Sequence, residues 1–510
     1  MAEYLLALDQ GTSSSRALLF DRTARLVASR QAPITTRTPR PGWVEFDATE
    51  IWRTQRDVAR ALLRDATTAE DRILACGIAN QRETAIVWDR RTLQPLGPAI
   101  GWECRRTADA ADALARSHGD TVRQTTGLIP DAYFSGPKIA WLLDHPTTPS
   151  TELRDRAAQG DIAAGTVDSW LLANLTRGEA HLTDRTNASR TLCYDIHHDR
   201  WDDALCVAQD VPRAILPQVR PSLAEFGVIA PDVLGRETPI LAVAGDQQSA
   251  LFGQACHTPG DTKVTYGTGA FLLSRRGPHA PTLLDGILTT AAVAADTSNS
   301  RAFALEGSVF SAGSVVQWLR DELNLAPTSD GITALAASVG ESGGIAVVPA
   351  FAGIGAPHWQ PHARGLITGL TRASTTAHLA RAALESVAFR IREIVDAIDR
   401  GHADPIGELR VDGGMAASDT LLQAQADVLA RPVVRPAQLE TTALGAALMA
   451  GLAAGCWANV SDLAATWQPV RRFEPTTDLD PTYNRWQRAR QAALDLANDA
   501  GEPGTDGAPR

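Results

Sequence analysis

The chain opens on YLLALDQGTSSSRALLF (residues 4–20), in which two apolar runs flank a polar turn. The runs Tyr4–Leu8 and Ala17–Phe20 predict the two strands of a hairpin. The turn between them, Asp9–Arg16, carries one glycine and four hydroxyl side chains. Its backbone N–H groups and hydroxyls would suit an anion. An ordinary solvated turn is the alternative interpretation, because serine and glycine are common in turns.

A weaker form of the same pattern returns near the midpoint of the chain. The apolar run Ile240–Ala244 predicts a strand that ends in GDQQ, and a helix is expected from Ser249. The segment TKVTYGTGAFLLS (residues 262–274) then repeats the order of strand, Gly-Thr-Gly turn and strand. Two halves that begin alike indicate a duplicated fold with a cleft between the copies, although so short a similarity could also arise by chance.

Strands and helices alternate between these two hairpins, which favours an α/β fold. Thr49–Arg64 predicts an amphipathic helix with Thr49 as its cap. Ile73–Ala79 predicts a strand that ends in NQRET, and Ala85–Trp88 predicts the next strand. Further on, TTALGAALMAGLAAG (residues 441–455) predicts a helix that packs very close to its neighbour, because glycine and alanine recur on successive turns.

Two carboxylates, Asp9 and Asp246, follow predicted strands and would point into the cleft. Phosphoryl transfer needs donors for phosphate oxygens, carboxylates for Mg²⁺ and a base for the acceptor. Either aspartate alone would more simply cap a turn, but as a pair beside hydroxyl-rich turns they indicate such a site. The chain has no Gly-Lys pair and therefore no P-loop. Arg82 and Glu83 could equally form a surface ion pair, and aromatic residues such as Trp102 and Tyr133 usually pack in a core.

Composition sets the broad class of the protein. Of 510 residues, 44% are hydrophobic and 21% charged, which is typical of an ordinary globular protein and compatible with an enzyme. The net charge of −11 argues against binding to nucleic acid or to anionic membranes. Six widely spaced cysteines are best interpreted as free thiols in a reducing compartment, and we expect a cytoplasmic location without a signal peptide or membrane span. Lysine occurs only at positions 138 and 263, a bias attributed here to genomic base composition.

Many longer motifs resemble one family, the FGGY carbohydrate kinases, and among them the members that phosphorylate glycerol. The matching motifs, in chain order, are DQGTSSSR, NQRET, AIGWECRR, DAYFSGPKIAWLLDH, GTVDSWL, DRTNASRT, AGDQQSALFGQ, TYGTGAF, LEGSVFSAG, PAFAGIGAPHW, ARGLITGLTR, RVDGG and ALGAALMAGLAAG. The resemblance implies the actin-like ATPase (ribonuclease H-like) fold, with duplicated lobes that close on ATP and Mg²⁺. We expect an N-terminal lobe over residues 1–250, a C-terminal lobe over 251–500 and a disordered tail over 501–510.

The resemblance also implies roles for individual residues. Asp246 would be the general base, and Asp9 and Asp246 would hold Mg²⁺. Glycerol would be bound by Arg82, Glu83, Trp102, Tyr133, Asp246, Gln247 and Phe271. ATP would be bound by Thr12, Ser13, Ser14, Arg16, Thr268, Gly313, Gln317, Gly414 and Ser418. Ser418 stands where the family usually carries an Asn, so the nucleotide contact there departs from the pattern.

The predicted reaction converts ATP and glycerol into ADP and sn-glycerol 3-phosphate, in glycerol catabolism. Two alternatives stay open from the sequence: a kinase of another polyol or ketose on the same fold, and a non-catalytic actin-like nucleotide-binding protein. Relatives are usually homodimers or homotetramers, so one of these states is expected. The segment before AGDQQ, FGVIAPDVLGRETPI, carries neither the glycine-rich loop nor the histidine through which some relatives are regulated.

Overall fold

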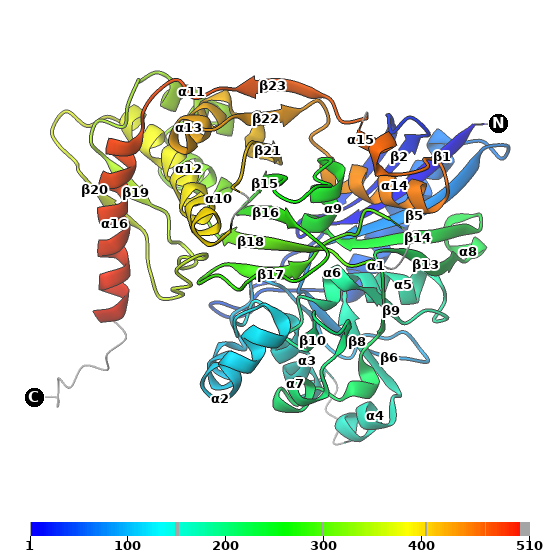
Figure 1. The fold of residues 1–510 in the computed structure, drawn as a ribbon. Helices are drawn as coiled ribbons and strands as arrows, with labels where there is room; N and C mark the ends of the chain where they lie inside the picture. Colours follow the sequence, from blue (N-terminus) through cyan, green and yellow to red (C-terminus); the bar gives the residue numbers. More distant parts are fainter. Residues whose placement is uncertain (1, 148–151, 297–299, 403–404, 465, 500–510) are drawn as a thin grey trace, which may run out of the picture.

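The computed structural model describes residues 2–147, 152–296, 300–402, 405–464 and 466–499. The predicted tail at 501–510 lies outside these ranges. Two large mixed sheets form the centre of the molecule, one built from the first half of the chain and one from the second (Figure 1).

The first sheet has six strands in the order β13-β14-β5-β1-β2-β3. Its strands are β1 (Glu3–Gln10), β2 (Ser14–Asp21), β3 (Leu26–Pro33), β5 (Arg72–Asn80), β13 (Leu223–Ile229) and β14 (Thr238–Gly245). From the edge strand β3 across to the other edge, β13, neighbouring strands pair in antiparallel, antiparallel, parallel, parallel and antiparallel directions.

The second sheet has seven strands in the order β17-β18-β16-β15-β21-β22-β23. Its strands are β15 (Thr262–Tyr266), β16 (Ala270–Arg276), β17 (Leu288–Ala291), β18 (Phe303–Val309), β21 (Leu409–Asp412), β22 (Val433–Pro436) and β23 (Pro469–Phe473). Starting at β18, the pairings repeat the sequence of directions found in the first sheet. This match confirms the predicted α/β fold with duplicated lobes.

Smaller elements complete the two halves. The first half adds a four-stranded sheet in the order β4 (Glu45–Phe46), β7 (Ala99–Ile100), β6 (Ala85–Asp89) and β8 (Ile162–Thr166). It also contains two strand pairs, β9 (Leu182–Asp184) with β12 (Gln218–Arg220) and β10 (Tyr194–Asp195) with β11 (Arg200–Trp201). Its helices are α1 (Ala48–Ala66), α2 (Ala108–Thr126), α3 (Ser135–Asp144), α4 (Leu153–Gln159), α5 (Val167–Leu175), α6 (Arg185–Ala188), α7 (Asp203–Ala208), η1 (Arg213–Ile215) and α8 (Pro231–Leu234). The rest of the chain adds α9 (Asp246–Gly253), α10 (Gly313–Asp321), α11 (Ser329–Ala337), β19 (Ala346–Val348), β20 (Leu366–Thr368), α12 (Thr376–Gly401), η2 (Gly414–Ala417), α13 (Asp419–Leu429), α14 (Thr441–Ala453), α15 (Val460–Ala464) and α16 (Asp480–Asp499). Among the described helices, none is long and apolar enough to span a membrane.

Three predicted boundaries were wrong. The first hairpin is tighter than expected, because Asp9 pairs with Arg16 across β1 and β2 and therefore lies inside a strand. The cap of α1 is Asp47, whose carboxylate accepts the backbone N–H groups of Thr49 and Glu50. Helix α9 begins at Asp246 and not at Ser249, so this carboxylate sits in the first helical turn, where the helix dipole favours a negative charge.

Both faces of the first sheet are buried. Leu6 and Leu8 of β1 pack with Ile51 and Leu62 of α1, whereas Leu5 and Ala7 belong to a separate cluster with residues of α14. This division follows from the alternation of side chains along a strand. In Figure 1, the orange helix α14 lies against the blue strands, although its sequence belongs to the second half of the chain.

Helix α14 also packs against α9 at very short range, as the glycine pattern predicted. A Cβ atom at Gly445 would lie 1.9 Å from the carbonyl oxygen of Ser249 on α9. A Cβ atom at Gly77 of β5 would lie 2.0 Å from the carbonyl oxygen of Ala446. Only glycine permits these backbone approaches.

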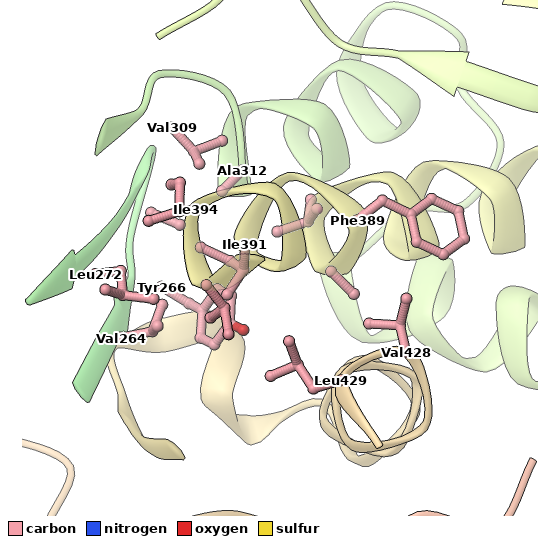
Figure 2. Close-up of a cluster of buried hydrophobic side chains, with 14 of the residues drawn as sticks. Val264, Tyr266, Leu272, Val309, Ala312, Phe389, Ile391, Ile394, Val428 and Leu429 are labelled. Carbon is pink, nitrogen blue, oxygen red and sulfur yellow. The ribbon is translucent and has the colours of Figure 1, made fainter. Parts of the chain in front are cut away.

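The core of the second lobe lies between its sheet and helices α12 and α13. Figure 2 shows Ile391 and Ile394 of α12 beside Val264 and Leu272 of the sheet, and all four belong to one buried cluster. Tyr266 is buried in the same cluster, where its hydroxyl donates to Gln425 Oε1 of α13 at 2.7 Å. This anchor holds the start of the Gly-Thr-Gly turn that follows β15.

Candidate active site

Two adjoining cavities mark the site, one between the two lobes and one within the second lobe. The smaller, of about 210 Å³, is lined by both hairpin turns and by the NQRET segment. The larger, of about 590 Å³, is lined by residues of the second half alone. They share Gly267 and Thr268, so the Gly-Thr-Gly turn stands where one cavity meets the other.

The smaller cavity brings together the two predicted carboxylates. Asp9 is 1% exposed, and its Oδ2 lies 2.6 Å from the Arg16 guanidinium. Asp246 keeps 26% of its side chain exposed, at the start of α9, and its Oδ1 accepts the backbone N–H of Gln247 at 2.7 Å. Burial raises the pKa of Asp9, which Arg16 opposes, and it raises the pKa of Asp246, which Arg82 and Lys263 oppose.

The donor set suits a magnesium ion that is held jointly with a substrate. Mg²⁺ in nucleotide sites takes one or two protein carboxylates together with phosphate oxygens and water. Asp9 and Asp246 supply two carboxylates that line one cavity. Within the described ranges, no group of three or more His, Cys, Asp or Glu side chains forms a metal site by itself.

Arg82 and Glu83 belong to a buried network of four charges. Arg82 donates to both carboxylate oxygens of Glu306, at 2.6 and 2.9 Å. Arg190 donates to Glu83 Oε1 at 2.6 Å and to Glu306 Oε1 at 3.0 Å. The side chains of all four residues are at most 2% exposed. Two positive and two negative charges balance, and Arg82 Nε remains 3.4 Å from Asp246 Oδ1.

The backbone of Glu83 is held in an unusual conformation. Its φ is +61°, in the left-handed region that non-glycine residues rarely adopt. Its carbonyl oxygen accepts Lys138 Nζ and Ser135 Oγ, each at 3.2 Å. Lys138 Nζ also donates to the carbonyl oxygen of Tyr133 at 2.7 Å, and burial lowers the pKa of Lys138 to about 7. This lysine therefore ties together two segments that line the cavity.

Three aromatic rings form one wall of the smaller cavity. Trp102 stands edge-on to Tyr133 and to Phe271, with ring centroids 5.8 and 5.9 Å apart. Trp102 Nε1 donates to Thr12 Oγ1 at 2.9 Å, which links the aromatic wall to the first hairpin turn. The cavity thus combines an apolar wall with charged and amide groups on its other sides.

The structure brings together most, but not all, of the sequence-predicted residues. Asp9, Thr12, Arg16, Arg82, Glu83, Trp102, Tyr133, Asp246, Gln247, Thr268 and Phe271 line the smaller cavity, and Thr268, Gly313, Gln317, Gly414 and Ser418 line the larger one. Ser13 and Ser14 line neither of these two cavities. Ser13 is exposed on the turn, and the Ser14 hydroxyl accepts Gln31 Nε2 at 3.1 Å.

Ser418, the departure from the family pattern, caps helix α13. Its hydroxyl accepts the backbone N–H of Leu421 at 3.3 Å. The helix cap gives this side chain a structural role in addition to its place in the wall of the larger cavity.

Sequence reasoning missed several residues of the site. Glu306 lies in LEGSVFSAG and Arg190 in DRTNASRT, motifs to which the sequence assigns no individual roles. Lys138 and Lys263 carry no local sign of function, and base composition explains their rarity. The charged partners of Arg190 and Glu306 lie more than a hundred residues away in the chain, and those of Lys138 are backbone carbonyls. Lys263 has side-chain partners nearer in the sequence, Gln247 and Thr265, but no local pattern shows that its side chain turns toward them. The sole available signal was the rarity of lysine in an arginine-rich chain.

Comparison with known proteins places the chain in a family. Residues 4–253 match the N-terminal domain model of the FGGY family of carbohydrate kinases, and residues 262–454 match its C-terminal domain model. The glycerol kinase of Delftia acidovorans is 52% identical over 96% of this chain and 99% of its own length, and that of Deinococcus radiodurans is 48% identical over 98% and 99%.

Solved structures agree with these sequence relatives. The crystal structure of Plasmodium falciparum glycerol kinase with ADP superposes with a TM-score of 0.88 at 31% identity, covering 97% of this chain and 98% of that one. A xylulose kinase from Rhodospirillum rubrum, at 23% identity and a TM-score of 0.83 over 98% and 99% of the two chains, shares the fold. The chain therefore belongs to the FGGY family of carbohydrate kinases.

Proposed function

We propose that this protein is a glycerol kinase, which transfers the γ-phosphate of ATP to glycerol and releases ADP and sn-glycerol 3-phosphate. The observation that carries the proposal is the smaller cavity, in which Asp246 and the Arg82–Glu83 pair face an aromatic wall beside a second, larger cavity. Relatives that carry this name match almost the full chain at about half identity, which supports the same acceptor.

The acceptor would occupy the smaller cavity. Glycerol offers three hydroxyl groups, each a donor and an acceptor, and Arg82, Glu83, Asp246 and Gln247 supply matching groups. Trp102 and Phe271 would cover its carbon edge. An acceptor that lacks one hydroxyl would leave a buried polar group unpaired, so the site would discriminate strongly against it.

ATP would span the junction of the two cavities. Its adenosine would lie in the larger cavity, near Gln317, Gly414 and Ser418, and its phosphates would reach the Gly267–Thr268 turn and the first hairpin. Thr12 and Arg16 would donate to phosphate oxygens. Asp9 and Asp246 would hold Mg²⁺, which supplies positive charge to the transferred phosphoryl group.

The transfer itself follows from this arrangement. The acceptor hydroxyl gives its proton to the Asp246 carboxylate while its oxygen bonds to the γ-phosphorus. The bond from that phosphorus to the β,γ-bridging oxygen breaks, and ADP leaves. The raised pKa of Asp246 makes it a stronger base than an exposed aspartate. Closure of the lobes, here units over about 1–250 and 251–500, would exclude water from the reaction.

We also propose a cytoplasmic location for the enzyme. All six cysteines are free, five of them buried, which supports a reducing cytoplasm. A homodimer or homotetramer is expected from the family resemblance and is checked by sedimentation velocity.

A coupled ADP-release assay tests the acceptor. We expect turnover with glycerol to exceed that with erythritol and ketopentoses, at saturating ATP and Mg²⁺. A preference for a ketopentose, or no turnover with glycerol, would overturn the assignment.

Asp246 is the proposed general base, and its substitution tests that role. Asp246→Asn is expected to lower kcat by about 10²-fold or more, the usual contribution of a general base, while ATP still binds. ATP binding is measured by calorimetry in parallel with turnover. A kcat within a factor of about three of wild type would remove Asp246 from this role.

A further inference from the structure

The two lysines of the chain have the same unusual environment. Lysine stands at only two of the 48 basic positions, Lys138 and Lys263, and both side chains are 0% exposed. A buried ammonium is costly unless it is fully engaged. Each lysine therefore needs hydrogen-bond partners that offset its loss of hydration. The mechanism described above gives neither lysine a role.

Lys263 contacts two residues of the acceptor cavity from behind. Its Nζ donates to Gln247 Oε1 at 2.6 Å and to Thr265 Oγ1 at 2.6 Å. Gln247 and Thr265 line the smaller cavity, whereas Lys263, on β15, does not. Burial lowers the pKa of Lys263 to about 8, while Asp412 and Asp246 oppose the shift, so the amine is mostly protonated at pH 7.

An ammonium group fixes which end of an amide faces it. It has three N–H donors and no acceptor, so the oxygen of Gln247 must point toward Lys263. The amide nitrogen, Nε2, then points the other way. Among the described residues no acceptor pairs with Nε2, and Gln247 is 6% exposed, through the cavity that it lines.

We propose that Lys263 is a positioning residue that aims the amide N–H groups of Gln247 at an acceptor hydroxyl. The inference rests on the proposed function, because it needs Gln247 to contact the polyol. Without the ammonium, the amide could turn its oxygen into the cavity, where it would offer an acceptor in place of a donor. Lys263 therefore determines whether Gln247 offers the bound hydroxyl a hydrogen-bond donor or an acceptor.

The size of lysine suits this task better than that of arginine. A compact ammonium can contact the amide oxygen and the Thr265 hydroxyl at once, whereas a planar guanidinium needs more room and directs its donors in a fixed fork. The remaining 46 basic residues of the chain are arginine, by difference from 48 with two lysines. The two exceptions both lie directly behind cavity-lining residues.

The experiment is a double-mutant cycle of Lys263→Met and Gln247→Leu, assayed by steady-state kinetics with glycerol and ATP. Lys263→Met is expected to raise the KM for glycerol about tenfold, the cost of one misdirected hydrogen bond, with the KM for ATP within about twofold. In the Gln247→Leu background the same change should lower kcat/KM for glycerol by less than about threefold, because its target is gone. If the loss in kcat/KM of the double variant equalled the product of the losses of the two single variants, the proposal would be overturned.

Lys138→Met is the matched control, since Lys138 is equally buried but contacts backbone carbonyls and not Gln247. Its fold loss in kcat/KM for glycerol should be the same in the wild-type and the Gln247→Leu backgrounds, because the two residues act independently. If Lys263→Met fails to fold by circular dichroism, Lys263→Gln replaces it in the cycle. Its amide can offer Gln247 either a donor or an acceptor and so no longer fixes the direction of that side chain. The rise in the KM for glycerol should then be smaller, but it should still be largely absent in the Gln247→Leu background. If wild type prefers another polyol, the proposed function fails, and the cycle on that polyol still tests the role of Lys263.

Discussion

At the scale of single residues, the site depends on a balance of buried charges. Glu306 receives hydrogen bonds from both Arg82 and Arg190, and burial alone would raise its pKa. The two guanidinium groups outweigh burial and lower the pKa of Glu306 to about 2. This shift contributes stability above pH 4.5 and is lost as the pH falls toward 2. In the physiological range the carboxylate is therefore a fixed negative charge behind Arg82.

We predict that Glu306→Gln lowers the free energy of unfolding by about 3–5 kcal/mol, because it leaves two buried guanidinium groups with a single carboxylate. The acceptor site should suffer as well, since Arg82 loses its bidentate partner, and kcat/KM for glycerol should fall at least tenfold. Urea unfolding and steady-state kinetics measure the two effects.

Glu474→Gln serves as the control, because Glu474 pairs with Arg472 at the surface and is 59% exposed. Exposed pairs contribute about 0–1 kcal/mol, so its urea midpoint should hardly move. Equal effects of the two substitutions would contradict the assigned role of Glu306.

At the scale of elements, the sequence predicted what local patterns determine. Apolar runs around Gly-Thr turns identified both hairpins, and the glycine–alanine repeat identified α14. The start of α9 was missed because Asp246 looked like a turn residue after β14, whereas it lies in the first turn of the helix. The partners of Arg82 could not be predicted, because Glu306 lies 224 residues further along the chain. Pairings of that range depend on how the two sheets are placed, and periodicity carries no information about them.

The contact of β5 with α14 gives a prediction at this scale. Gly77→Ala would place a Cβ atom 2.0 Å from the carbonyl oxygen of Ala446, a backbone atom that cannot move without shifting the helix. We expect a loss of about 3 kcal/mol or more in the free energy of unfolding, at or beyond the upper end of ordinary overpacking. Thermal and urea unfolding measure it.

Gly119→Ala in α2 makes the same chemical change in open space, since nothing lies within 4 Å of the added Cβ atom. Gly119 follows a kink of α2 at His118, so the helix propensity of alanine applies only in part. The substitution should change the free energy of unfolding by no more than about 1 kcal/mol, because the added methyl group meets no other atom. A Gly77→Ala variant as stable as this control would show that α14 can move away from the sheet.

At the scale of the whole molecule, the two halves of the chain are interlocked. Family models and sheets divide it near residues 254–261, yet α14 crosses back to cover one face of the first sheet. Leu5, Ala7 and Phe20 share a cluster with Ala446 and Met449. Helix α14 also packs closely on α9, the last helix before the second sheet begins, so this pair of helices holds the two halves of the chain together.

We therefore predict that a fragment of residues 1–255 does not fold stably alone. Without α14 it exposes the apolar face of the first sheet, and such a patch favours aggregation. It should bind the dye ANS, unfold without a cooperative transition and be cut rapidly by proteases. Addition of residues 441–456 through a flexible linker should restore a cooperative transition, because the helix covers the face again. A fragment 1–255 that stays monomeric and unfolds cooperatively would show that the first lobe folds without α14.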